Sequence, residues 1–261
     1  YIVAAQGPLG NDTDPDTNDV LAVKSVEGSA ANVGSQFALG SGALLTVNAD
    51  GSYEYDPNGQ FDSLNVGQTA NDSFVYIATD GNGGDTASNT VSLMITGLND
   101  LPVAVADGGS VDENAVLNVA ASGLLSNDTD ADTTSTLSVK SVEGSAANVG
   151  TEITLGSGAL LTVNSDGSLT YDPNGQFESL AVGQSQGDPF QYVVTDGEGG
   201  DSLPGTATPL VQGENDAPSA ADNTLAVDED VAYSFQESDF GFTDIDTGDA
   251  LEHITLTTLP A

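Results

Sequence analysis

The chain has 261 residues, of which 40 are acidic and only two are Lys or Arg, so its formal net charge is -38. So acidic a chain has no basic patch with which to bind nucleic acid or an anionic membrane surface. It has no cysteine, which excludes disulfides and thiolate metal sites, and no apolar run approaches the roughly 20 residues needed for membrane insertion.

The chain contains an internal repeat. Residues 23–34 recur without change as residues 139–150, 116 positions later, and residues 40–48 recur as 156–164. A repeat this long indicates a whole domain in each unit. The predicted boundaries are a repeat lacking its first strand at 1–101, a complete repeat at 102–217, and the start of a third repeat at 218–261.

The chain reads as β-strand throughout. Apolar residues alternate along segments such as Leu161 to Val163 and Phe190 to Val194, which is the period of a half-buried strand. Asp50-Gly51 and Asp166-Gly167 stand between such segments, where an Asp-Gly pair supplies the positive φ angles of a tight hairpin. With seven or eight strands expected in each unit, we predict an all-β fold of tandem, immunoglobulin-like antiparallel sandwiches.

Many of the acidic residues gather in short runs that begin with Asn, at 11–16 and 127–132. With two basic residues in the chain, almost none of these carboxylates can pair with a protein cation. Oxygen-rich clusters of Asp and Asn are the ligands that calcium prefers. The sequence therefore predicts Ca²⁺ as the bound cofactor.

Several segments of the complete repeat carry a family resemblance. Residues 123–132, 190–197 and 215–218 resemble the bacterial cadherin-like repeats, also called VCBS or tandem-95 repeats. Such repeats belong to large RTX-type surface adhesins and biofilm matrix proteins. The resemblance implies a secreted, extracellular or cell-surface location, and calcium at the joints between domains.

The linkers are similar to the calcium-binding linkers of cadherins. Each linker contains an Asn-Asp pair, one residue and then a Pro, at residues 99–102 and 215–218. About eleven residues beyond each Pro is a glutamate, Glu113 or Glu229. The turn-capping alternative for the Asn-Asp pairs remains open. The complete set of predicted ligands is Asp12, Asp14, Asp16, Asp80, Asp85, Asn99, Asp100, Asp112, Glu113, Asp128, Asp130, Asp132, Asp196, Glu198, Asp201, Asn215, Asp216 and Glu229.

Strand parity predicts which acidic loops meet. In a seven-strand sandwich the loop after the first strand shares an end of the domain with the outgoing linker, which places Asp12, Asp14 and Asp16 beside Asn99 and Asp100. The last hairpin, with Asp196, Glu198 and Asp201 in the second unit, would face them across the joint. A split first strand would reverse this parity.

No catalytic constellation is expected. The complete repeat has neither Cys nor His, so a nucleophile would lack its base. We expect a calcium-stiffened spacer or fibre-forming repeat of a large adhesin or filament. The alternative is a carbohydrate- or protein-binding module, although the absence of Trp disfavours a sugar site.

The expected partners are neighbouring repeats of the same polypeptide or copies of the chain in a fibre. The cell-surface or carbohydrate ligand of the full protein would be bound elsewhere. The tail segment 226–235 corresponds to the strand that the first repeat lacks, so two alternatives stand: a window cut from a longer protein, or strand exchange between copies.

Chelation should destabilise the protein. At about 4 Å each pair of like charges costs roughly 1 kcal/mol even in water, and clustered carboxylates repel one another when no divalent ion lies between them. We expect EDTA to lower the melting temperature in ordinary salt, with calcium restoring it. An unchanged melting curve would show that calcium has no structural role.

Overall fold

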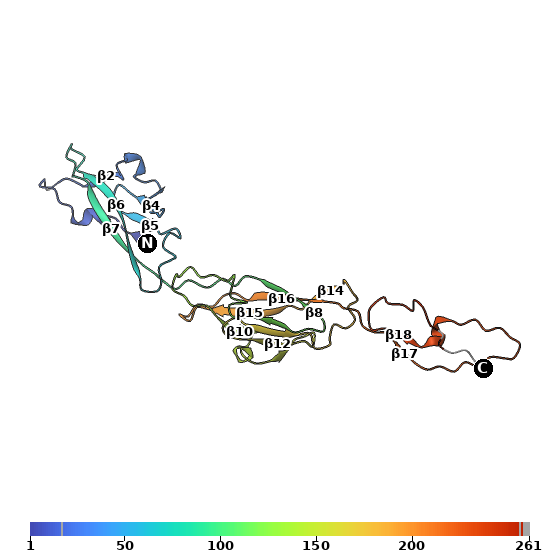
Figure 1. The fold of residues 1–261 in the computed structure, drawn as a ribbon. Helices are drawn as coiled ribbons and strands as arrows, with labels where there is room; N and C mark the ends of the chain where they lie inside the picture. Colours follow the sequence, from blue (N-terminus) through green and yellow to red (C-terminus); the bar gives the residue numbers. More distant parts are fainter. Residues whose placement is uncertain (17, 256, 258–261) are drawn as a thin grey trace. The chain divides into compact units, whose positions relative to one another are not determined.

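The computed structural model describes residues 1–16, 18–255 and 257. They form two compact units, of which unit 1 comprises residues 1–100 and 130–135, and unit 2 comprises residues 101–129 and 136–261. Both units are built of strands and short 3₁₀ turns (Figure 1).

Unit 1 packs two sheets against each other. One sheet has the order β1-β5-β4-β3 and the other the order β2-β6-β7. The strands are β1 (Ile2–Val3), β2 (Ala22–Val26), β3 (Phe37–Ala38), β4 (Leu44–Val47), β5 (Tyr53–Asp56), β6 (Thr69–Thr79) and β7 (Asn89–Thr96), with 3₁₀ turns η1 (Gly7–Asn11) and η2 (Ala30–Asn32).

Unit 2 repeats this arrangement with two more strands before its tail. Its sheets have the orders β11-β12-β13-β9 and β10-β15-β16-β14, and β8 pairs with β16. The elements are β8 (Asp107–Asp112), β9 (Leu117–Val119), β10 (Ser138–Val142), η3 (Ala146–Asn148), β11 (Ile153–Thr154), β12 (Leu160–Val163), β13 (Leu169–Asp172), β14 (Ser185–Gly187), β15 (Phe190–Thr195) and β16 (Gly205–Gln212). The tail adds β17 (Ser219–Ala220), η4 (Glu237–Phe240) and β18 (Phe242–Thr243).

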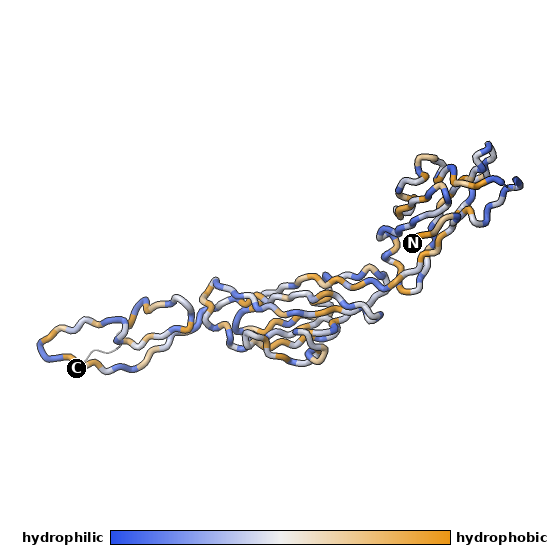
Figure 2. The backbone as a smooth tube through the Cα atoms, turned by 180° about the vertical axis from the view of Figure 1, so that it is seen from behind, coloured by the Kyte–Doolittle hydropathy of each residue, from blue (hydrophilic) through white to orange (hydrophobic). Residues whose placement is uncertain are grey.

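Alternating apolar residues form one core in each unit (Figure 2). In unit 2 the predicted residues Leu161, Val163, Tyr171, Phe190 and Tyr192 are all at most 1% exposed. Their polar neighbours on the same strands face outward, as the two-residue period of a strand requires. The prediction of an all-β fold of tandem antiparallel sandwiches is confirmed.

The first strand of unit 2 is split into β8 and β9. Because β14 and β15 also stand where unit 1 has the single strand β6, the complete repeat has nine strands among the described residues, above the seven or eight expected. β8 runs parallel to β16 along six paired residues. A turn in which Ala115 N donates to Asp112 O then reverses the chain, and β9 returns antiparallel to β13 in the opposite sheet. The loop that follows therefore lies at the end of the unit where β8 began.

The Asp-Gly hairpins depart from the predicted geometry. Gly51 and Gly167 have φ values of 81° and 80°, whereas Asp50 and Asp166 do not have positive φ. Each Asp instead accepts hydrogen bonds from a Ser two residues later, as Ser168 N and Oγ donate to Asp166 Oδ1 at 3.0 and 2.7 Å. These bonds lower the pKa of Asp166, because they stabilise its charged form.

Beside the core of each unit, one carboxylate accepts hydrogen bonds from two hydroxyl groups. In unit 2, Asp188 is 8% exposed and its Oδ2 accepts from Tyr171 OH at 2.8 Å and Ser157 Oγ at 2.7 Å. In unit 1, Tyr55 OH donates in the same way to Asp72, which is less buried.

This pair of sites provides a matched stability test. Tyr171→Phe leaves a buried carboxylate with one donor fewer and should cost about 1.5–3 kcal/mol of unfolding free energy, the usual range for a bond to a charged group. Tyr55→Phe should cost less because water can replace the hydroxyl at Asp72. Urea unfolding followed by circular dichroism measures both, and equal losses would contradict the role assigned to burial.

Candidate metal centre

The first acidic cluster joins the linker of unit 1 to the loop at 130–135. Asp100 N donates to Asp132 Oδ2 at 2.9 Å, and Asp132 N donates to Asp130 Oδ1 at 2.8 Å. Asn65 holds the same loop, since its Oδ1 accepts from Thr134 N at 3.3 Å. All of these residues belong to unit 1.

Two carboxylate oxygens in this cluster are buried without a hydrogen-bond donor from the described residues to offset the loss of water. Asp132 is 3% exposed, and its Oδ1 and the Oδ2 of Asp130 have no hydrogen-bond partner among the described residues. Burial raises the pKa of Asp100, and the charges of Asp62, Asp132 and Asp130 raise it further. The raised pKa shows that this site disfavours negative charge as long as it contains only protein atoms.

A second cluster repeats the first within unit 2. Asp216 N donates to Asp246 Oδ2 at 2.9 Å, and Asp246 N donates to Asp244 Oδ1 at 3.0 Å. Carboxylate oxygens of Asp244, Asp246 and Asp249 lie within 4.8 Å of one another. Asp246 is 4% exposed, and its Oδ1 and the Oδ2 of Asp216 have no hydrogen-bond partner in the described part of the chain.

Glu113 completes the second cluster. Its side chain is 2% exposed, its Oε1 accepts from Glu214 N at 2.8 Å, and its Oε2 has no partner among the residues described. Burial is the main cause of its raised pKa, and Asp216, Glu178 and Asp246 add repulsion. The turn after β8 places it here, because Glu113 N also donates to Gln212 O at the end of β16.

These oxygens fit a calcium ion. Burying an ionised carboxylate without a partner is costly, and the only two lysines of the chain pair elsewhere. Calcium binds six to eight oxygens at 2.3–2.6 Å, so ligand oxygens on one ion lie up to about 5 Å apart. The 4.8 Å grouping of Asp244, Asp246 and Asp249 matches that span.

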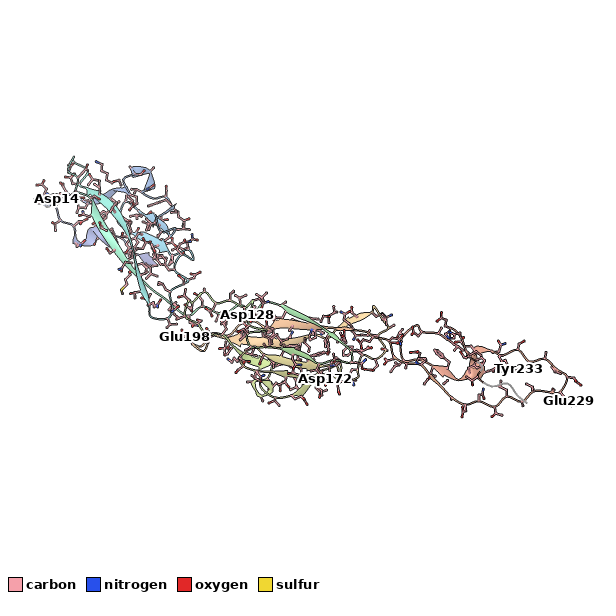
Figure 3. All side chains as sticks on the ribbon, viewed as in Figure 1. Asp14, Asp128, Asp172, Glu198, Glu229 and Tyr233 are labelled. Carbon is pink, nitrogen blue, oxygen red and sulfur yellow. The ribbon has the colours of Figure 1, made fainter. Side chains whose placement is uncertain are left out.

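A third group lies at the N-terminal end of β2 in unit 1. Carboxylate oxygens of Asp14, Asp19 and Asp80 lie within 4.8 Å of one another. Asp80 Oδ1 also accepts from Asn82 N at 2.8 Å and Gly84 N at 3.0 Å, so the hairpin backbone already supplies donors to it. These three side chains are half-exposed, and Figure 3 shows Asp14 on its loop.

The parity prediction was wrong. Asp14 lies with Asp80 of the last hairpin, and not beside Asn99 and Asp100, whereas Asp100 is bonded to Asp132. The cause is the direction of β1, which pairs antiparallel with β5, just as β9 pairs antiparallel with β13 after the split of the first strand in unit 2. The loop therefore lies at the same end of its domain as the last hairpin.

Other predicted ligands have local partners. Lys24 pairs with Asp85 and Lys140 with Asp201, which lowers the pKa of both aspartates. Four more predicted ligands also have hydrogen-bond partners close by. Asp12 accepts a hydrogen bond from Tyr76 OH, and Asp128 accepts one from Tyr192 OH. In the last hairpin Asp196 accepts from Glu198 N, and in the outgoing linker the Asn215 side chain donates to Asp216 O.

Four predicted ligands, Asp16, Asp112, Glu198 and Glu229, are exposed. Glu229 is on the tail of unit 2 (Figure 3). Their assignment as metal ligands stays a prediction.

Sequence reasoning missed six acidic residues of the clusters: Asp19, Asp62, Glu178, Asp244, Asp246 and Asp249. Two signals could have found most of them. Asp244-Ile-Asp246 has the spacing of Asp130-Ala-Asp132, and Asp62 and Glu178 occupy the same position of the repeat, directly after Gln-Phe.

The comparisons with known proteins assign the family. The family model described as bacterial cadherin-like domain matches residues 1–97 and 99–213. The chain therefore belongs to the bacterial cadherin-like domain family, as its sequence resemblance indicated. Among curated protein sequences none matches it.

Solved cadherin structures are similar to this chain at low identity. The Drosophila N-cadherin EC1-4 structure is 12% identical with a TM-score of 0.41, and the match covers 80% of this chain and 45% of that one. Protocadherin gamma B7 domains 1–4 are 13% identical with a TM-score of 0.44, covering 90% of this chain and 56% of that one. The chain thus spans about half the length of these structures.

Family membership carries a general functional class. Domains of this family are extracellular adhesion or structural repeats that typically lack enzymatic activity and generally bind calcium. In the part of the chain that the structure describes, no helix is long and apolar enough to cross a membrane.

Glu113→Gln should have opposite effects without and with calcium. Because the pKa of Glu113 is raised above 4.5, the folded protein without calcium retains a proton that the unfolded chain releases, so its stability falls as pH rises through the folded pKa. Gln removes that uncompensated charge and should stabilise the protein without calcium at pH 7 by about 1–3 kcal/mol.

The same variant lacks one calcium ligand, so adding calcium should raise its melting temperature by less than it raises that of wild type. Thermal melts in EDTA and in calcium measure both effects. Glu54→Gln, on an exposed position of β5, serves as the control and should change neither melt. A Glu113→Gln protein that gains as much from calcium as wild type would remove Glu113 from the ligand set.

Proposed function

We propose that this chain is a calcium-stiffened spacer of a large extracellular bacterial adhesin or filament. The observation that carries the proposal is the recurrence of one bonding scheme at two linkers. Asp100 and Asp216 each donate a backbone N–H to a buried Asp of a following loop. Around each bond lie buried carboxylate oxygens that have no hydrogen-bond partner in the described structure.

A cation at each cluster would stiffen the linker. Without one, the buried carboxylates repel one another and favour separation of the linker from the loop. With calcium bound, the same oxygens become ligands, and separating them breaks metal–oxygen contacts. Asp100, Asp130 and Asp132 would hold the ion in the first cluster, and Glu113, Asp216 and Asp246 in the second.

The positions of the aromatic residues favour a spacer over a sugar-binding module. Tyr53, Tyr55, Phe74 and Tyr76 are each at most 8% exposed in the core of unit 1, whereas sugar sites generally present aromatic rings at the surface. We propose neighbouring repeats as the partners of this chain. A cell-surface or carbohydrate ligand of the full protein would be bound elsewhere. The proposed location is the cell surface or the secreted matrix.

Asp132→Asn tests the first linker. It keeps the side-chain shape but removes one charge from a buried ligand, so calcium affinity at this cluster should fall at least tenfold, equivalent to about 1.4 kcal/mol. Calorimetry measures affinity and stoichiometry, and small-angle scattering should show a broader range of particle lengths at calcium concentrations that saturate wild type.

The matched control is Asp166→Asn, in an exposed hairpin whose Ser168 donors an amide oxygen can still satisfy. It should bind calcium as wild type does. Equal calorimetric curves for wild type and Asp132→Asn would contradict the assignment of the first linker cluster.

A further inference from the structure

The chain contains three Asn-Gly pairs, at residues 58–59, 82–83 and 174–175. In such a pair the backbone nitrogen of the glycine can attack the side-chain carbonyl carbon of the asparagine, because glycine has no Cβ to block the close approach. All three asparagines are exposed. Exposure therefore does not distinguish them, and a difference in reactivity has to come from how each side chain is held.

Two of the three asparagines are anchored in the same way. Asn58 Nδ2 donates to Gly42 O at 3.1 Å, and Gln60 Nε2 donates to Asn58 O at 2.9 Å. Asn174 makes the equivalent two bonds in unit 2, also at 3.1 and 2.9 Å. An anchored amide has to leave its acceptor before its carbonyl carbon can meet the next backbone nitrogen, so these bonds oppose the reaction.

Asn82, in the last hairpin of unit 1, has no such anchor. Its backbone N–H donates to Asp80 Oδ1 at 2.8 Å, but its side chain has no hydrogen-bond partner among the described residues. The space at Gly83 is open, since apart from its chain neighbours no atom lies within 4 Å of the place that a Cβ would take. The amide of Asn82 can therefore turn toward the nitrogen of Gly83 without its side chain losing a hydrogen bond.

The equivalent position in unit 2 is already acidic. Residues 79–85 recur as residues 195–201 with one change, which is Glu198 in place of Asn82. Glu198 N donates to Asp196 Oδ1 at 2.7 Å, as Asn82 N does to the aspartate of its own hairpin. A carboxylate at this position thus fits the hairpin with its backbone bonds intact.

We propose that Asn82-Gly83 is a site of spontaneous deamidation, and that side-chain anchoring protects the other two Asn-Gly pairs. The nitrogen of Gly83 bonds to Cγ of Asn82, the Cγ–Nδ2 bond breaks, and the amide nitrogen leaves as ammonia with the proton from Gly83. Water then opens the cyclic imide. Opening at Cγ gives aspartate and opening at the backbone carbonyl gives isoaspartate, so either product carries one new carboxylate.

Deamidation would add this charge to an end of unit 1 that is already acidic. Carboxylate oxygens of Asp14, Asp19 and Asp80 lie within 4.8 Å of one another, and Lys24 is engaged with Asp85. Because like charges repel, the product should be less stable than the original chain when no divalent cation is present. This consequence for calcium dependence rests on the proposed function, whereas deamidation itself does not.

Peptide mapping by mass spectrometry tests the site in the folded, full chain. Samples are taken over time at mildly alkaline pH, which favours loss of the glycine amide proton. The mass increase from replacement of an amide by a carboxylate should appear at Asn82 about tenfold faster than at Asn58 or Asn174, equivalent to about 1.4 kcal/mol of activation free energy. In urea the anchors are lost, and the three rates should converge.

Gln60→Ala tests the role of the anchor. It removes the donor to Asn58 O and should speed deamidation at Asn58 about threefold, because less hydrogen bonding then opposes the reaction. Asn174 keeps its bond from Gln176 and is the control within the same molecule. An unchanged rate at Asn58 would contradict protection by anchoring.

Asn82→Asp tests the consequence for stability. It supplies the charge of the product and should lower the melting temperature in EDTA, with calcium restoring it. The matched control is Gln36→Glu, which adds the same charge at an exposed position where unit 2 has Glu152, and which should change the melt in EDTA less.

Two results of the mapping would overturn the proposal. These are a rate at Asn82 in the folded chain no higher than at the anchored pairs, and a difference between the sites that persists unchanged in urea. Equal melts of Asn82→Asp and Gln36→Glu in EDTA would remove the consequence for stability. Calorimetric failure to bind calcium would remove the proposed function and the calcium dependence, while deamidation would still be decided by the mapping.

Discussion

Burial of carboxylate oxygens without protein cations is the constraint on which both linkers depend. Asp132, Asp246 and Glu113 are each less than 5% exposed, and each has an oxygen with no hydrogen-bond partner in the described chain. A protein cannot hold such charge cheaply in a medium of low polarity, and it must protonate the groups or neutralise them. With both lysines engaged elsewhere, a bound calcium ion is the neutralising partner that we propose.

The chain also shows which of its acids need no metal. Asp50 and Asp166 accept bonds from the Ser of their own hairpins, and Asp188 accepts from two hydroxyls beside the core. Asp85 pairs with Lys24. In the described part of the chain, most of the buried carboxylate oxygens that lack a hydrogen-bond partner lie where linkers and following loops converge, and Asp128 Oδ2 is an exception. Local hydrogen bonding, and not the density of acidic residues along the sequence, separates structural carboxylates from candidate ligands.

The two repeats act as an internal comparison. They share their strand order, their Lys–Asp pairs and the bonding scheme of their linkers. They differ at one sheet edge: β8 pairs with β16 in unit 2, whereas among the described residues no strand pairs with the second edge of β7. The change from buried to half-buried side chains along the matched strands β16 and β7 shows how much of the core depends on that single parallel strand.

The alternating strands, the turns and the acidic linkers could be predicted from the amino-acid sequence, because each depends on residues close together in the chain, and the repeat could be predicted because its residues recur unchanged 116 positions later. Which acids meet depends on how the strands pack. In unit 2 the reversal after Asp112 makes β9 antiparallel to β13, and in unit 1 β1 has the same direction against β5. This direction places Asp14 with Asp80 and leaves Asp100 to Asp132. Asp62, Glu178 and Asp246 approach the linkers through packing across long sequence separations. The sequence marks them as recurring acidic positions but does not show which linker each one meets.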